Sequence, residues 1–140
     1  MVKKKKNKTT YLIGAAIVFV SILFVFFYFK SIEVKELKMD AEVTCPKCAG
    51  FNLNTDAVHF GKVPLGGSAV RNITIQGDSK NHKVVLKAYG ELAKWVSTTQ
   101  NDFKLNAWET RGDIALVLKV PKDAEMRKYE GTLKIYFYPG

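Results

Sequence analysis

The hydrophobic and polar positions of the chain follow two different patterns, which change near residue 30. Residues 11–29, YLIGAAIVFVSILFVFFYF, contain no charged residue. From residue 51 onward, short apolar stretches alternate with polar positions and turn residues, and no segment keeps a helical period. The pattern therefore predicts one apolar helix near the start of the chain and a region of short strands after it.

The apolar run is long enough to cross a bilayer. Nineteen helical residues rise about 28 Å in total, which is close to the thickness of the hydrocarbon layer. A secretory signal peptide usually has an apolar part of about 7–15 residues followed by a small-residue cleavage site. The run here is longer, FKSIEVKELKMD after it offers no A-x-A pattern, and Glu42 does not fit a lipoprotein signal. We expect an uncleaved transmembrane anchor over residues 11–29.

Seven short strands are expected beyond residue 50, over residues 56–60, 68–76, 83–90, 94–99, 102–106, 113–120 and 132–138. GKVPLGG (61–67) reads as a turn because of its glycines and proline. A two-residue period marks half-buried strands and points one set of side chains inward: Ile73, Ile75, Ile114, Leu116, Leu118, Val120, Leu133, Ile135 and Phe137. Trp95 and Trp108 are expected to pack in or beside the core. The fold class is all-β, an Ig-like antiparallel β-sandwich of about seven strands preceded by one N-terminal transmembrane helix.

Charge suggests how these parts are arranged about a membrane. Lys3, Lys4, Lys5, Lys6 and Lys8 precede the apolar run without any acid, whereas the other flank mixes both signs. Positive flanks are retained in the cytoplasm. We therefore expect a cytoplasmic tail over residues 1–10, the helix over 11–29, an external stalk over 30–50 that carries CPKC, and an external sandwich over 51–140.

The net charge of +9 is concentrated in the tail. Five of the 22 Lys and Arg residues lie there, so residues 30–140 hold 17 against 13 Asp and Glu. A nucleic-acid-binding surface would gather positive charge into one stripe. The external region shows no such stripe, and we expect no nucleic-acid partner.

Two segments resemble a known group of domains. FGKVPLGGSAVRNITIQG resembles the opening of immunoglobulin-like domains of the ASH (Hydin-like) and major sperm protein/PapD-like type, which start F-G-x-V-x-x-G. VPKDAEMRKYEGTLKI is similar to the P-x-x-A…Y-x-G closing segment of extracytoplasmic Ig-like modules. The likeness covers residues 55–138. It implies a module that binds other proteins and has no catalytic centre. Tyr129 in KYEG also suits a tyrosine corner, with its hydroxyl returned to the backbone.

Nothing in the chain predicts an enzyme. Its histidines are His59, within an expected strand, and His82, at the end of a polar loop. Neither a G-x-S-x-G elbow nor a P-loop occurs, because GKVPLGGS lacks the Lys-Ser ending. The carboxylates are scattered over loops and strand starts. We therefore assign no catalytic residue and no cofactor.

Cys45 and Cys48 are the only cysteines, and they form a C-P-K-C motif. A redox C-x-x-C needs a helix start, which this region lacks. A zinc site wants four ligands, which two chains together would supply, clamping a homodimer. A local disulfide between Cys45 and Cys48 is the preferred interpretation, because an external domain is exposed to an oxidising environment. Intermolecular disulfides and free thiols complete the alternatives.

The sequence thus leaves more than one hypothesis for function. The first is a membrane-anchored module that binds other proteins through sheet edges or end loops. The second is a thiol- or metal-handling protein that works through Cys45 and Cys48. A third is packing of the anchor helix with partner helices, with Gly14 and Ser21 on one face. Asn72-Ile73-Thr74 is in addition an N-x-T sequon in the expected external region.

Overall fold

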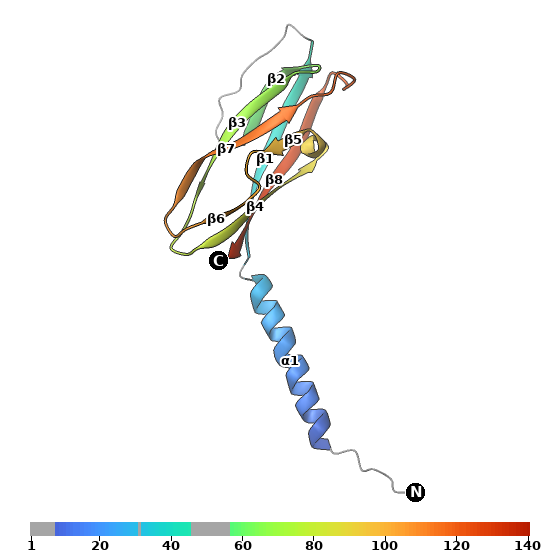
Figure 1. Ribbon diagram of the computed structural model, residues 1–140. Helices are drawn as coiled ribbons and strands as arrows, with labels where there is room; N and C mark the ends of the chain where they lie inside the picture. The colour runs from blue at the N-terminus through green and yellow to red at the C-terminus, as the bar shows by residue number, and fades with distance from the viewer. Residues whose placement is uncertain (1–7, 31, 46–56) are drawn as a thin grey trace, which may run out of the picture. The chain divides into compact units, whose positions relative to one another are not determined.

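The computed structural model describes residues 8–30, 32–45 and 57–140. The chain divides into two compact units, residues 1–32 and residues 33–140, and each is considered by itself. The first unit contains helix α1 (Lys8–Lys30) and the second contains the strands (Figure 1).

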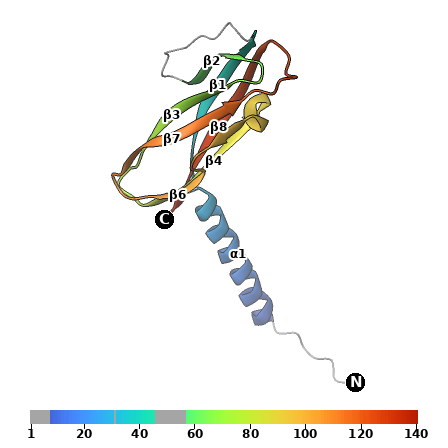
Figure 2. The same ribbon diagram turned by 45° about the horizontal axis from the view of Figure 1, so that its top comes forward.

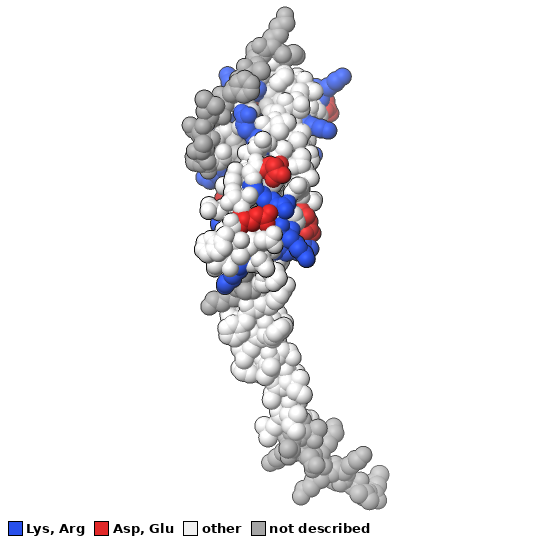
Figure 3. Space-filling model, turned by 60° about the vertical axis from the view of Figure 1, so that its left-hand side comes forward, with Lys and Arg blue, Asp and Glu red and all other residues white. Residues whose placement is uncertain are grey.

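Helix α1 is apolar on all sides. Its stretch Tyr11–Phe29 has a mean hydropathy of 2.7, and none of it is buried. On the face drawn in Figure 3, the described part of the helix shows no charged side chain. By length and composition the helix can cross a membrane, a test that a signal sequence near the N-terminus also passes. The predicted N-terminal apolar helix is confirmed.

The second unit is an all-β domain of two sheets, seen in Figures 1 and 2. The five-stranded sheet has the order β2-β1-β8-β4-β6 and the three-stranded sheet the order β3-β7-β5. A short 3₁₀ helix, η1 (Glu91–Lys94), follows β4. The described strands are β1 (Glu33–Thr44), β2 (Val58–Pro64), β3 (Ser68–Gln76), β4 (His82–Gly90), β5 (Val96–Thr98), β6 (Asp102–Leu105), β7 (Thr110–Lys119) and β8 (Lys128–Pro139). The predicted β-sandwich class is confirmed, and each of the seven predicted strands overlaps one of β2 to β8.

Strand β1 corrects the predicted stalk. Residues 33–42 of this strand pair with β8 antiparallel, from Glu33 opposite Phe137 to Glu42 opposite Lys128. On its other side, β1 pairs with β2 in parallel. A stalk over residues 30–50 was therefore wrong for residues 33–44, which lie inside the larger sheet. The physical reason is the alternation of Leu37, Met39, Ala41 and Val43 with charged neighbours, which buries one face of the strand.

The core lies between the two sheets. Every inward position predicted from the two-residue period is buried, from Ile73 at 9% exposed to Ile114, Leu116 and Leu118 at 0%. The larger sheet adds side chains that the sequence did not place in the core, among them Met39, Ala41, Val43, Phe60, Val84 and Leu105. Burying aliphatic and aromatic side chains of this kind is the main stabilising contribution to such a domain.

The two tryptophans have opposite environments. Trp95 is partly buried against the core, and its ring lies 4.6 Å from the ring of Tyr129. Trp108 is 74% exposed. Core packing was thus the right prediction for Trp95 and the wrong one for Trp108, because Trp108 lies in the turn between β6 and β7 and not on a strand.

The predicted turn over residues 61–67 is shorter than expected. Strand β2 continues through Gly61 to Pro64, and the turn is confined to residues 65–67, where Gly67 N donates to Pro64 O at 2.9 Å. Gly61 has a φ of 76°, and the register with β1 shifts between Asp40 and Glu42. A glycine at positive φ lets the strand bulge there and continue, where another residue would strain it.

Candidate functional site

The predicted cysteine site lies at the end of β1. Cys45 follows Thr44 directly and is disulfide-bonded. A sulfur in a disulfide has no thiolate to offer a metal. Within residues 8–30, 32–45 and 57–140, no group of three His, Cys, Asp or Glu side chains is arranged to hold a metal ion. Cys48 lies outside the described residues, so the predicted Cys45–Cys48 disulfide and the two-chain zinc clamp, which would need Cys45 in its reduced form, both stay predictions.

The sheet edges offer a different kind of site. Strand β3 forms one edge of the three-stranded sheet, and its ladder partner among the described strands is β7 alone (Figure 1). It has nine residues, whereas the edge strands β5 and β6 have three and four. A long edge strand presents a row of backbone N–H and C=O groups to which another chain can add a strand.

The direction of these groups follows from the ladder. Val120 N donates to Gly67 O at 2.9 Å, so the backbone of Gly67 faces β7. Bonding alternates along an antiparallel pair, so Ser68, Val70 and Asn72 turn their N–H and C=O groups away from β7. Arg71 Nη1 donates to Val70 O at 3.3 Å, which agrees with that carbonyl facing outward.

Arg71 is the one side chain of β3 shown to bind an outward backbone group of the edge, the carbonyl of Val70. The strand, SAVRNITIQ, has Arg71 as its one charged residue and contains no proline. Natural edge strands are usually protected by lysines, prolines or short length. Val70 is 52% exposed, and Asn72 is exposed as predicted. The edge is thus long, uncharged for most of its length and accessible in the described part of the domain.

The other long edge is partly closed by a side chain. Strand β2 ends the five-stranded sheet, and His59 on this strand has its carbonyl oxygen 2.6 Å from Arg71 Nε. The guanidinium of Arg71 therefore reaches from β3 across the corner between the sheets. The same guanidinium donates to Val70 O on β3, so β3 is distinguished from β2 by its greater length, nine residues against seven.

No family model, curated protein or solved structure matches this chain. The resemblance to Ig-like domains of the ASH and major sperm protein/PapD type therefore stays a prediction.

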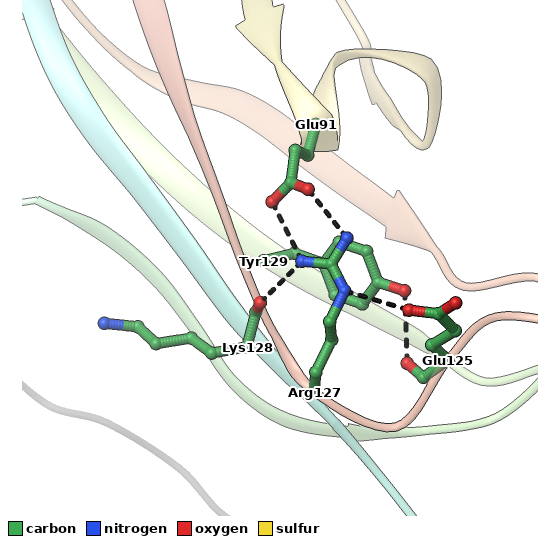
Figure 4. Close-up of polar contacts among 5 residues, drawn as sticks. All are labelled: Glu91, Glu125, Arg127, Lys128 and Tyr129. Atoms are coloured by element: carbon green, nitrogen blue, oxygen red, sulfur yellow. Dashed lines mark hydrogen bonds and ion pairs between the residues drawn. The ribbon is translucent and has the colours of Figure 1, made fainter.

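A cluster around Arg127 closes the end of the domain near η1, as Figure 4 shows. Its guanidinium binds Glu91 through two nitrogens, at 2.7 and 3.2 Å, and also donates to Glu125 at 3.3 Å. The same group stacks 3.9 Å from the ring centre of Tyr129. Tyr129 is 5% exposed and donates its hydroxyl to Glu125 O at 3.1 Å, which is the predicted tyrosine-corner role.

This cluster joins segments that are far apart in the sequence. Hydrogen bonds from Arg127 lower the pKa of the Glu91 carboxyl, and the same pair raises the pKa of Arg127. Because Arg127 precedes β8 and Glu91 begins η1, their hydrogen bonds connect η1 to the start of β8. Sequence reasoning found Tyr129 but missed Arg127 and Glu91, because no local pattern links residues 36 positions apart.

Both histidines are paired with aspartates, which the sequence did not predict. His59 Nδ1 lies 2.9 Å from both carboxylate oxygens of Asp40, its register partner on β1. His82 Nε2 lies 2.8 Å from Asp78 Oδ1 and lowers the pKa of that carboxyl. The Asp40–His59 pair borders a hollow of about 540 Å³ on the five-stranded sheet, with Lys128 also contributing to its lining. These pairs tie β2 to β1 and β4 to the loop before it.

Proposed function

We propose that this chain is a single-pass membrane protein whose β-domain lies outside the cytoplasm and binds other proteins by strand addition at β3. The anchor is α1, and the five lysines of the tail keep the N-terminus in the cytoplasm. Its role is that of an accessory subunit, scaffold or assembly factor of a membrane or cell-surface complex.

One observation carries this proposal. Strand β3 is a nine-residue edge strand with outward-facing backbone groups at Ser68, Val70 and Asn72 and no proline or lysine to protect it. In strand addition, backbone hydrogen bonds provide affinity and the alternate side chains provide specificity. Val70 and Asn72 are the side chains that an incoming strand would meet on the exposed face.

The test is a pull-down of the full chain from membranes in mild detergent, with partners identified by mass spectrometry. Val70→Pro removes an outward N–H without removing a bond to β7, because proline is tolerated at a strand edge. Val70→Thr is the matched control, since it keeps the N–H and a β-branched side chain at the same position. We expect Val70→Pro to lower partner recovery by roughly tenfold and Val70→Thr to retain it.

Two outcomes would contradict the proposal. Equal recovery of the same partners with Val70→Pro, for a variant whose unfolding temperature is unchanged, would exclude binding at this edge. Recovery of a monomer without any partner from native membranes would exclude the interaction role itself. A second copy of the chain as the sole partner would identify the edge as a homodimer contact, and Val70→Pro would then yield monomers.

A further inference from the structure

Trp108 is held in a conformation that large side chains rarely adopt. It has a φ of 61°, and it is the one non-glycine residue with positive φ among the described residues. A bulky residue in this region carries backbone strain. Its indole is also 74% exposed, so burial of the ring in the domain does not compensate for the strain.

The turn that carries Trp108 is fastened from several sides. Trp108 N donates to Asp78 O at 2.7 Å, and Ala107 N donates to the side-chain oxygen of Asn81 at 2.9 Å. Asn106 donates from both its backbone and its side chain to Glu109 Oε2, at 2.8 and 2.9 Å. The loop of residues 77–81 therefore fixes the turn of residues 106–109. Together they present the indole at the surface.

The strand registers show which end of the domain holds this turn. Glu33, the first residue of β1, pairs with Phe137 near the end of β8. His82, the first residue of β4, pairs with Pro139 at the end of β8. The start of β1 therefore lies at the same end of the domain as the start of β4 and the C-terminus.

The registers of β6 and β7 show that Trp108 lies at this same end of the domain. Leu105, the last residue of β6, pairs with His82, and Thr110, the first residue of β7, pairs with Gln76 at the end of β3. The turn 106–109 thus lies at the end of the domain where the chain enters β1. This end is called the entry end below.

Chain length limits the distance between the first residue of β1 and the end of α1. Helix α1 ends at Lys30 and β1 begins at Glu33. A link of two residues lets Glu33 lie at most about 11 Å from Lys30, whatever the orientation of the two units. If α1 spans the membrane, Glu33 at the entry end stays within this distance of the end of the helix.

We propose that Trp108 inserts into the interfacial layer of the bilayer that α1 crosses. The indole has an apolar ring and one N–H donor, and tryptophan is enriched at the level of lipid headgroups for that reason. Lysines at the same end, Lys80 in the 77–81 loop and Lys104 beside Leu105, would meet anionic headgroups. Asp78 and Glu109 are bound within the domain, to His82 and to Arg111. This inference rests on the proposed anchoring role of α1.

The experiment uses the full chain reconstituted into phosphatidylcholine vesicles, with and without phosphatidylglycerol, in which bromine on the acyl chains quenches nearby indoles. The chain has two tryptophans, so Trp108→Gly leaves Trp95 as the background. Glycine adopts positive φ without strain, so this variant is expected to fold at least as stably as the parent chain. We expect the parent chain to show a blue-shifted, quenched component that Trp108→Gly lacks.

The outcomes separate the two proposals. Release of the parent chain from vesicles by alkaline carbonate would overturn the anchoring role of α1. Retention of the chain with equal quenching for parent and Trp108→Gly would overturn the lipid contact alone. Loss of a protein partner with Trp108→Gly, without any quenching of the parent in protein-free vesicles, would assign the indole to a protein surface and also overturn the lipid contact. The lipid contact of Trp108 would be supported if the quenching is unchanged in Val70→Pro and absent in Trp108→Gly.

Discussion

Tyr129 is the residue whose role was predicted most fully from the sequence. Its ring is buried and its hydroxyl donates to Glu125 O, four residues earlier. The K-Y-E-G context and the general behaviour of tyrosine corners were enough to indicate this. The ring also contacts Trp95 and carries the guanidinium of Arg127 on its face.

Removal of the Tyr129 hydroxyl is expected to weaken the domain. Tyr129→Phe keeps the ring contacts and leaves the carbonyl of Glu125 without this donor, so we expect a loss of about 1 kcal/mol in the free energy of unfolding. Chemical denaturation of the detergent-solubilised chain measures the change. Tyr138→Phe is the control, because Tyr138 points its ring outward to stack on Tyr136. An equal loss for both variants would show that the corner hydrogen bond is not the cause.

The remaining site residues show why single residues were harder to predict. Arg127 and Glu91 meet only in the folded domain, and so do Arg71 and the carbonyl of His59. Trp108 was misplaced because a large aromatic residue is usually buried, whereas its environment depends on a turn fixed by Asp78 and Asn81. Sequence patterns report periodicity along one element, and these contacts join different elements.

Strands with clean alternation were predicted well, and the exception was informative. The segments that became β3 and β8 were located from one apolar face, and their inward residues are buried. Strand β1 was missed because its outer face is strongly charged, with Glu36, Lys38, Asp40 and Glu42. These charges suggested a solvated stalk. The opposite face of the strand, however, carries the apolar residues Met39, Ala41 and Val43, which are buried.

The position of β1 predicts how the domain can be shortened. A fragment of residues 32–140 keeps all eight strands and is expected to unfold in one cooperative thermal transition. A fragment of residues 51–140 loses the strand between β2 and β8, so β8 gains an open edge and Met39, Ala41 and Val43 leave the core. We expect this shorter fragment to aggregate or remain unfolded.

Circular dichroism and size-exclusion chromatography of the two fragments make the comparison. A folded monomer from residues 51–140 would restore the stalk interpretation of residues 33–44. Residues 33–44 would then not be needed for the stability of the compact unit that begins at Glu33.

Acid should destabilise the domain as a whole, because carboxylates at different places in it have lowered pKa values. The largest cause in each case is a hydrogen bond, from His82 to Asp78, from Arg127 to Glu91 and from the backbone N–H of Asn106 to Glu109. The ordinary pKa values are 3.8 for Asp78 and 4.5 for the two glutamates. A carboxyl whose pKa is lower in the folded state contributes stability above its ordinary pKa, and that contribution is lost as pH falls through the folded value.

The expected result is an unfolding temperature that changes little from about pH 7 to 5 and falls below about pH 4. Glu109→Gln removes one of the three contributions, so its unfolding temperature should fall less steeply over the acid range. Differential scanning calorimetry across this range measures both. An unfolding temperature that stays constant down to about pH 2 would show that these hydrogen bonds do not favour the folded state.

The pairing of β1 with β8 has a consequence for biosynthesis. Glu33 opens β1, whereas its partner Phe137 lies about a hundred residues later in the chain. In a protein made from the N-terminus onward, β1 would leave the ribosome long before its partner is synthesised. The larger sheet can close only when β8 has also left the ribosome. A chain stopped before β8 would thus keep β1 as an unpaired, exposed strand, to which chaperones and proteases can bind.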